Sequence, residues 1–231
     1  VLGIGALVTP AYADALYFDQ GSSSTWIDDD STQNWAIDTG GPYDATAWID
    51  ASDAHFEGAG GTVTVSGTIG SVNGIAFDVS GYTVTGGTLT LTGDAVVHSD
   101  ISDWTTVESI LAGTAGMTKT GSGDVVLRAV STYTGNTSIQ EGYLILGSGN
   151  DRLPVGTTVV LGNDTTSGVL SLGSGTTWRE QTLSGLVTNG TGSENRVVGA
   201  GTATTYSTLT VDIAGTNVFD GILGGSSGTE N

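Results

Sequence analysis

Three groups of residues in this 231-residue sequence have types that catalysis or metal binding requires. The first is Lys119-Thr120-Gly121, which spells the K-T-G box found in serine enzymes that act on penicillins. Those enzymes also need an S-x-x-K motif, and Lys119 is the only lysine in the chain. We therefore interpret Lys119 as a structural residue at a corner of the fold.

The second group is the pair of histidines, His55 and His98. A Ser-His-Asp triad needs a serine presented on a sharp turn between a strand and a helix, and the sequence predicts no such elbow. Both histidines are therefore interpreted as surface residues.

The third group is the carboxylates, beginning with the run Asp28-Asp29-Asp30. An EF-hand loop starting at Asp28 would need glycine at its sixth position, where Gln33 stands. The glycine-rich nonapeptide of calcium-binding β-rolls is absent as well. We interpret the run as a solvated acidic loop.

Paired carboxylates can also hydrolyse glycosides, but no pair among the 24 acidic residues stands in a recognisable motif. A lyase-type site would draw its base from Lys119 or from the four arginines, Arg128, Arg152, Arg179 and Arg196. The sequence thus predicts no enzyme, no catalytic residue, no cofactor and no metal site, and it leaves any binding residues unassigned.

Composition and charge indicate the elements that carry these residues. The chain has 38 Gly, 37 Thr and 23 Ser, no Cys, and a net charge of −19. Many Thr and Val residues punctuated by Gly predict an all-β fold of short strands and tight turns. The negative charge disfavours nucleic acid and direct lipid binding, and the absence of Cys excludes disulfides and thiolate sites.

Both ends of the sequence carry signals of a longer protein. Residues 1–13 combine an apolar run with Ala11-Tyr12-Ala13, which predicts the remnant of a secretory signal peptide. At the other end, residues 220–228 repeat the pattern of residues 108–116 and stop where the earlier copy runs on. We therefore expect an exported protein whose C-terminus is truncated in this sequence.

The middle of the chain divides into two regions. Residues 14–60 contain Trp26, Trp35 and Trp48 and are predicted to form an N-terminal cap region. These tryptophans are also candidates for stacking on sugars. Residues 61–231 alternate polar and apolar residues in short runs such as Thr62–Ser66. The runs fit a sandwich, a barrel or a solenoid, and the scarcity of Asn-Gly and Asp-Gly turns favours the solenoid.

One stretch is more specific. Residues 116–147 contain Lys119-Thr120-Gly121-Ser122-Gly123, then Thr132-Tyr133-Thr134-Gly135, then Gly142-Tyr143-Leu144-Ile145-Leu146-Gly147. This order resembles the autotransporter-associated β-strand repeat, also called the passenger-associated transport repeat. The sequence departs from the pattern at Ser131, where Asn is usual, and at Asn136, where Gly is common.

The resemblance implies a right-handed parallel β-helix exported by a Gram-negative-type bacterium, either secreted or displayed on the cell surface. In that fold, Gly121 and Gly123 would form tight corners. The ring of Tyr133 would pack on the neighbouring turn with its hydroxyl in water.

The expected function is a non-catalytic, structural or adhesive rod. The alternatives are a glycan-binding or glycan-cleaving β-helix and a self-assembling fibre subunit. Candidate partners are host or matrix glycans, cell-surface proteins and further copies of the chain.

Overall fold

A computed structural model describes residues 15–18, 24–29, 33–37, 45–202 and 205–226. These residues form strands and turns, and none of them lies in a helix. Among them there is accordingly no helix long and apolar enough to cross a membrane. The predicted signal-peptide remnant, residues 1–13, lies outside the described residues.

The strands follow one another closely along the chain. In order they are β1 (Ala15–Phe18), β2 (Thr25–Ile27), β3 (Trp35–Ala36), β4 (Ala45–Thr46), β5 (Ser52–Phe56), β6 (Thr62–Phe77), β7 (Thr83–Ser99), β8 (Thr105–Val107), β9 (Ile110–Gly113), β10 (Met117–Thr120), β11 (Asp124–Leu127), β12 (Thr137–Ile139), β13 (Gly142–Leu146), β14 (Thr158–Leu161), β15 (Gly168–Ser174), β16 (Thr177–Trp178), β17 (Glu180–Leu183), β18 (Gly185–Thr188), β19 (Arg196–Gly199), β20 (Gly201–Thr202), β21 (Thr205–Tyr206), β22 (Thr208–Val211) and β23 (Ile222–Ser226).

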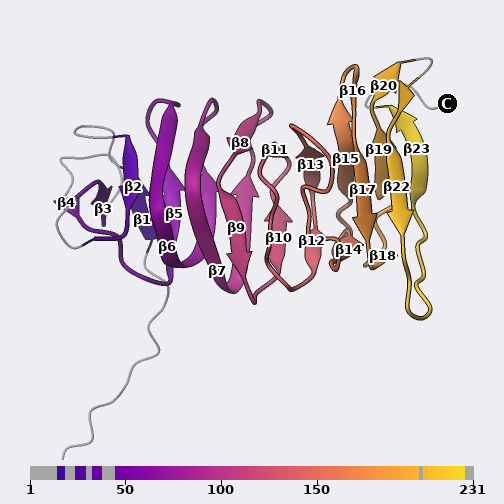
Figure 1. Cartoon of the computed structure of the whole chain (residues 1–231), viewed down its shortest axis with the longest axis horizontal. Coiled ribbons are helices and arrows are strands. Elements are labelled where there is room, and N and C mark those ends of the chain that lie inside the picture. The colour runs from indigo at the N-terminus through magenta and orange to yellow at the C-terminus, as the bar shows by residue number, and fades with distance from the viewer. Residues whose placement is uncertain (1–14, 19–23, 30–32, 38–44, 203–204, 227–231) are drawn as a thin grey trace, which may run out of the picture.

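The strands stack in parallel ladders that run the length of the molecule. One ladder follows β7, β10, β12, β14 and β18. Another follows β8, β11, β13, β15, β19 and β23. Each strand pairs with the strand one turn earlier and one turn later, which is the pattern of a coil and not of hairpins. The fold is a β-solenoid of about eight turns, as the sequence predicts (Figure 1).

The parallel stacking extends into the tryptophan-rich region. Strand β5 pairs in parallel with β1 and with β6, while β3 and β4 add antiparallel pairs beside β1. Inside this end, Trp26, Trp35 and Trp48 lie with ring centroids 4.9–5.0 Å apart. All three side chains are buried, so they form the first layer of the core.

Glycines that the sequence offers as strand ends lie inside two long, bent strands. Strand β6 runs from Thr62 to Phe77, and its register against β7 shifts at three places, the first between Val65 and Thr68. Gly67 stands in that first shift with a φ of +75°, a conformation that residues with a Cβ rarely adopt. The glycines therefore bend the strands around the corners of the coil without ending them.

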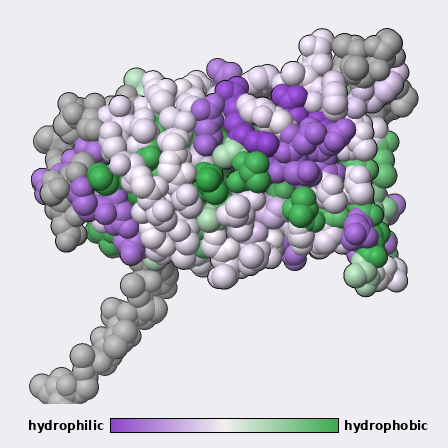
Figure 2. All heavy atoms as spheres, in the orientation of Figure 1, coloured by the Kyte–Doolittle hydropathy of each residue, from purple (hydrophilic) through white to green (hydrophobic). Residues whose placement is uncertain are grey.

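Alternation of side chains builds the interior. In β6, Val63 and Val65 point inward while Thr62 and Thr64 are exposed. The buried apolar residues form one continuous cluster from Leu16 to Val197. In the view of Figure 2, hydrophilic residues gather over the turns from β11 to β19, and apolar residues gather at the C-terminal end of the stack.

Candidate functional site

The segment that the sequence singles out, residues 116–147, supplies β10 to β13 in the middle of the solenoid. Strands β10 and β11 pair with β7 and β8 of the preceding turn. They pair equally with β12 and β13 of the following turn. The segment therefore contributes strands to two successive turns of the coil, which backbone ladders join to each other.

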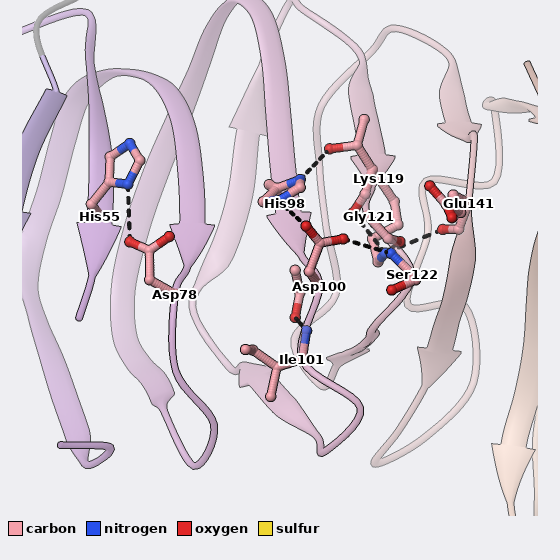
Figure 3. Close-up of polar contacts among 11 residues, drawn as sticks. His55, Asp78, His98, Asp100, Ile101, Lys119, Gly121, Ser122 and Glu141 are labelled. Atoms are coloured by element: carbon pink, nitrogen blue, oxygen red, sulfur yellow. Dashed lines mark hydrogen bonds and ion pairs between the residues drawn. The ribbon is translucent and has the colours of Figure 1, made fainter. Parts of the chain in front are cut away.

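Lys119 lies on the inward face of β10, the same face as Met117, and its side chain is fully buried. Its ammonium group donates to the carbonyl oxygens of Thr120 at 2.8 Å and Gly121 at 2.7 Å. A third bond, 3.2 Å long, reaches the carbonyl of Glu141 in the next turn (Figure 3). All three protons of the ammonium are thus used. The ammonium group of Lys119 thus hydrogen-bonds the backbone of its own corner to the backbone of the following turn.

Burial lowers the pKa of Lys119 to about 8, and the charges of Asp124, Glu141 and Asp100 oppose that change. With no exposed surface, this amine cannot reach a substrate in solvent. The interpretation of Lys119 as a corner residue therefore agrees with its geometry.

The corner itself depends on two glycines. Gly121 has a φ of +79°, and a Cβ added there would lie 2.4 Å from the carbonyl oxygen of Ser99. A Cβ on Gly123 would lie 2.1 Å from the carbonyl oxygen of Ile101. Both distances are far inside van der Waals contact, so only glycine lets successive corners stack this closely.

Asp100, in the preceding turn, hydrogen-bonds the same corner at Ser122. Its carboxylate accepts the backbone N–H of Ser122 at 3.0 Å. This bond lowers the pKa of Asp100, and the neighbouring His98, 3.2 Å away, contributes in the same direction. Figure 3 shows both contacts beside Lys119.

Tyr133 differs from its sequence prediction. Its side chain is buried, and its hydroxyl lies 2.6 Å from the hydroxyl of Thr137. Thr137 in turn lies 3.0 Å from Thr157, whose hydroxyl donates to the carbonyl of Gly135 at 3.1 Å. The expectation of a hydroxyl in water is wrong because inward-facing threonines supply a partner inside the core. Burial raises the pKa of Tyr133 well above its usual range.

Comparison with protein-family models identifies this segment. Residues 117–146 match the passenger-associated transport repeat. The matched residues lie within the stretch 116–147 on which the sequence resemblance rests, so the resemblance is confirmed.

A second comparison relates a longer part of the chain to a curated protein. Over 110 residues, or 47% of this chain, it is 39% identical to the adhesin BmaC autotransporter of Brucella suis biovar 1 (strain 1330). The aligned part covers 3% of that protein, so the chain spans a small fraction of this relative's length. Comparison with solved structures found no match.

The outer face of the repeat carries a row of side chains that sequence reasoning missed. The ladder of β11, β13, β15 and β19 aligns Asp124, Tyr143, Val169 and Arg196, one residue per turn. These positions alternate with core residues such as Val125 and Leu144, so they lie on the opposite face of the strands. Asp124, Tyr143 and Arg196 are partly exposed there, whereas Val169 is buried. The register continued by one residue from Thr105 places Trp104 beside Asp124, and the Trp104 side chain hydrogen-bonds that carboxylate. We call these five residues the outer ladder.

A shallow hollow of about 350 Å³ lies beside the outer ladder, next to the repeat. Its lining comprises Ser122, Glu141, Gly142, Tyr143, Ser167, Val169, Glu194 and Arg196. Arg196 forms an ion pair with Glu194, and the N–H of Glu194 donates to the hydroxyl of Ser167 at 3.0 Å. The hollow thus combines an aromatic ring, carboxylates, a hydroxyl and a guanidinium.

The remaining candidates lie apart from the hollow. His55 pairs with Asp78 at 3.0 Å, and His98 lies 2.9 Å from the hydroxyl of Thr120 (Figure 3). Asp28 accepts the N–H of Gly70 at 3.2 Å, whereas Asp30 lies outside the described residues. Within the described part of the chain, no group of three or more His, Asp or Glu residues could hold a metal ion.

The last candidate residues from the sequence are the tryptophans and the arginines. Because Trp26, Trp35 and Trp48 are buried, the idea that they stack on sugars is wrong; Trp104 and Trp178 are the exposed ones, at 48% and 38%. Arg128 pairs with Glu108 at 2.8 Å. Arg152 donates to the carbonyl of Arg128, and Arg179 to that of Trp178.

Proposed function

We propose that this chain is a non-catalytic segment of the adhesive rod of a passenger protein. The passenger is secreted or displayed on the surface of a Gram-negative-type bacterium. The observation that carries the proposal is the passenger-associated transport repeat at residues 117–146, set within a continuous solenoid. The likeness to a protein named an adhesin autotransporter supports the same conclusion.

The positions of the reactive side chains support a structural role. Lys119 is buried at a corner of the coil, and Trp26, Trp35 and Trp48 are buried in the core. His55 and His98 each pair with an aspartate. The acidic surface keeps such a rod soluble and favours partners that are not anionic. Within this proposal, residues 14–60 cap the N-terminal end of the solenoid, where β3 and β4 replace parallel pairing with antiparallel pairing.

The surface location is tested on intact cells of the bacterium that encodes the chain. Antibodies against residues 61–202 should label unpermeabilised cells, or should detect the protein in the culture medium. External protease should remove the label from cells while a cytoplasmic marker survives. Label that appears only after permeabilisation would contradict the proposal. Release of reducing ends from a polysaccharide by the pure chain would contradict its non-catalytic part.

A further inference from the structure

The outer ladder places two partly exposed aromatic rings in one row along the solenoid. Trp104 is 48% exposed, and Tyr143 is partly exposed two turns further on. Neighbouring strands lie about 4.8 Å apart, so the two residues stand roughly 10 Å apart along the row. That spacing is close to the length of two pyranose rings joined in a chain.

Hydrogen-bonding groups flank the two rings. Asp124 stands between them, and it already accepts a hydrogen bond from Trp104. Glu141 and Glu194 line the hollow beside Tyr143, where Arg196 supplies the donor. Carboxylates accept hydrogen bonds from sugar hydroxyls, a guanidinium donates to sugar oxygens, and an aromatic face packs on the C–H face of a pyranose ring.

The negative charge of this surface discriminates between uncharged and acidic sugars. The outer ladder and the hollow carry Asp124, Glu141 and Glu194 against the single cation Arg196, in a chain whose net charge is −19. Uronic or sialic acid chains are repelled by this surface, and so are nucleic acids. The ligand that fits is an uncharged, linear oligosaccharide.

We propose that the outer ladder binds an uncharged pyranose oligosaccharide that lies along the solenoid axis, with about one sugar ring per turn. This proposal deepens the adhesive function and rests on it, because it names the chemistry of the partner. Trp104 and Tyr143 carry the stacking, while Asp124, Glu141 and Arg196 bind the hydroxyls.

The test is calorimetric titration of the full chain with cellohexaose, N-acetylchitohexaose and β-1,4-mannohexaose, and with hexagalacturonate as the charged counterpart. At least one uncharged hexamer should bind, and hexagalacturonate should not. Trp104→Ala and Tyr143→Ala should each weaken binding about tenfold. Tyr143→Phe keeps the ring and should stay within about twofold of the parent.

Trp178→Ala is the matched control, because Trp178 is exposed but lies in β16, outside the outer ladder. Its affinity should equal that of the parent. The melting temperature of each variant confirms that it is folded. The proposal is overturned if no uncharged hexamer binds at millimolar concentration, or if a bound hexamer is indifferent to Trp104→Ala and Tyr143→Ala.

The same variants separate this proposal from the adhesive function. If the parent chain adheres to host or matrix surfaces and the Trp104→Ala/Tyr143→Ala double variant adheres equally well, the oligosaccharide proposal fails and adhesion stands. If the hexamers bind in a ladder-dependent way but the parent adheres to no surface, the ligand assignment stands and the adhesive function fails.

Discussion

Replacement of Lys119 by methionine tests the corner that defines the repeat. Methionine is also unbranched and apolar, so it preserves the packing beside Met117 and removes only the charge and its hydrogen bonds. The three carbonyl oxygens that accept from Lys119 would lose this partner inside the fold. The change therefore isolates the contribution of the ammonium group.

Two opposing free energies set the magnitude. Hydrogen bonds from a cation stabilise a fold by about 1.5–3 kcal/mol each, and Lys119 makes three. Burial of the charge opposes them: the fall of the pKa from 10.5 to about 8 corresponds to a cost of about 3 kcal/mol. We expect Lys119→Met to lower the free energy of unfolding by on the order of 3 kcal/mol at neutral pH.

The pH dependence has a definite sign. Below the folded pKa of about 8, both the folded and the unfolded chain hold the proton, so the folded protein bears the full cost of the buried charge. Between about 8 and 10.5 the unfolded chain binds more protons than the folded one, and stability rises with pH. The gap between parent and Lys119→Met should therefore widen by about 2 kcal/mol up to a pH of about 9.5.

Urea unfolding followed by tryptophan fluorescence measures this difference in the free energy of unfolding. Amide hydrogen exchange across residues 117–146 serves as a local probe, because solenoids can unfold turn by turn.

Arg152→Met is the control: Arg152 also donates to backbone carbonyls, but most of those bonds are exposed, so the change should cost at most about 1 kcal/mol. Lys119→Arg keeps a charge and should lose the pH dependence. Equal stability of parent and Lys119→Met, or a gap that does not widen with pH, would refute this reasoning.

Two further predictions concern the rest of the fold. Tyr133→Phe removes the buried bond to Thr137 and should cost about 1–2 kcal/mol, seen as a lower urea midpoint; no change would contradict the hydroxyl chain. Gly123→Ala should destabilise the chain by more than about 3 kcal/mol, whereas Gly156→Ala, with open space around it, should be nearly neutral in the same assay.

The fold class is readable from the sequence because its signals are local. Alternation in Thr62–Ser66 reveals a strand and its inward face, and the apolar triplet Val125-Val126-Leu127 reveals a buried strand. The lengths of the strands are not readable in this way. Glycine marks both strand ends and bends, and Gly67 proves to be a bend because its neighbours keep their partners in the next turn.

The site depends on contacts between distant residues, which is why most of it escapes the sequence. Lys119 is recognisable as a corner residue, but its third acceptor, Glu141, lies in the next turn. The hydroxyl of Tyr133 is buried because Thr137 and Thr157 face inward and supply its partners. A single residue type does not reveal the face on which it lies.

One feature of the sequence could have revealed part of the outer ladder. Asp124 and Tyr143 each stand immediately before an apolar triplet, so an alignment of the triplets would have placed them in one row. Trp104 joins that row only through the register of β8, whose sequence, Thr105-Thr106-Val107, is not apolar enough to be recognised.

Binding of the folded chain to surfaces tests the adhesive role most directly. Fluorescently labelled chain is titrated onto cultured host cells and onto surfaces coated with extracellular matrix, beside an unrelated acidic β-solenoid of similar net charge. If the chain is an adhesive passenger segment, its binding should be saturable and unlabelled chain should displace it. The control solenoid should not bind in this way. Binding that is linear in concentration, or equal to that of the control, would contradict the proposed function.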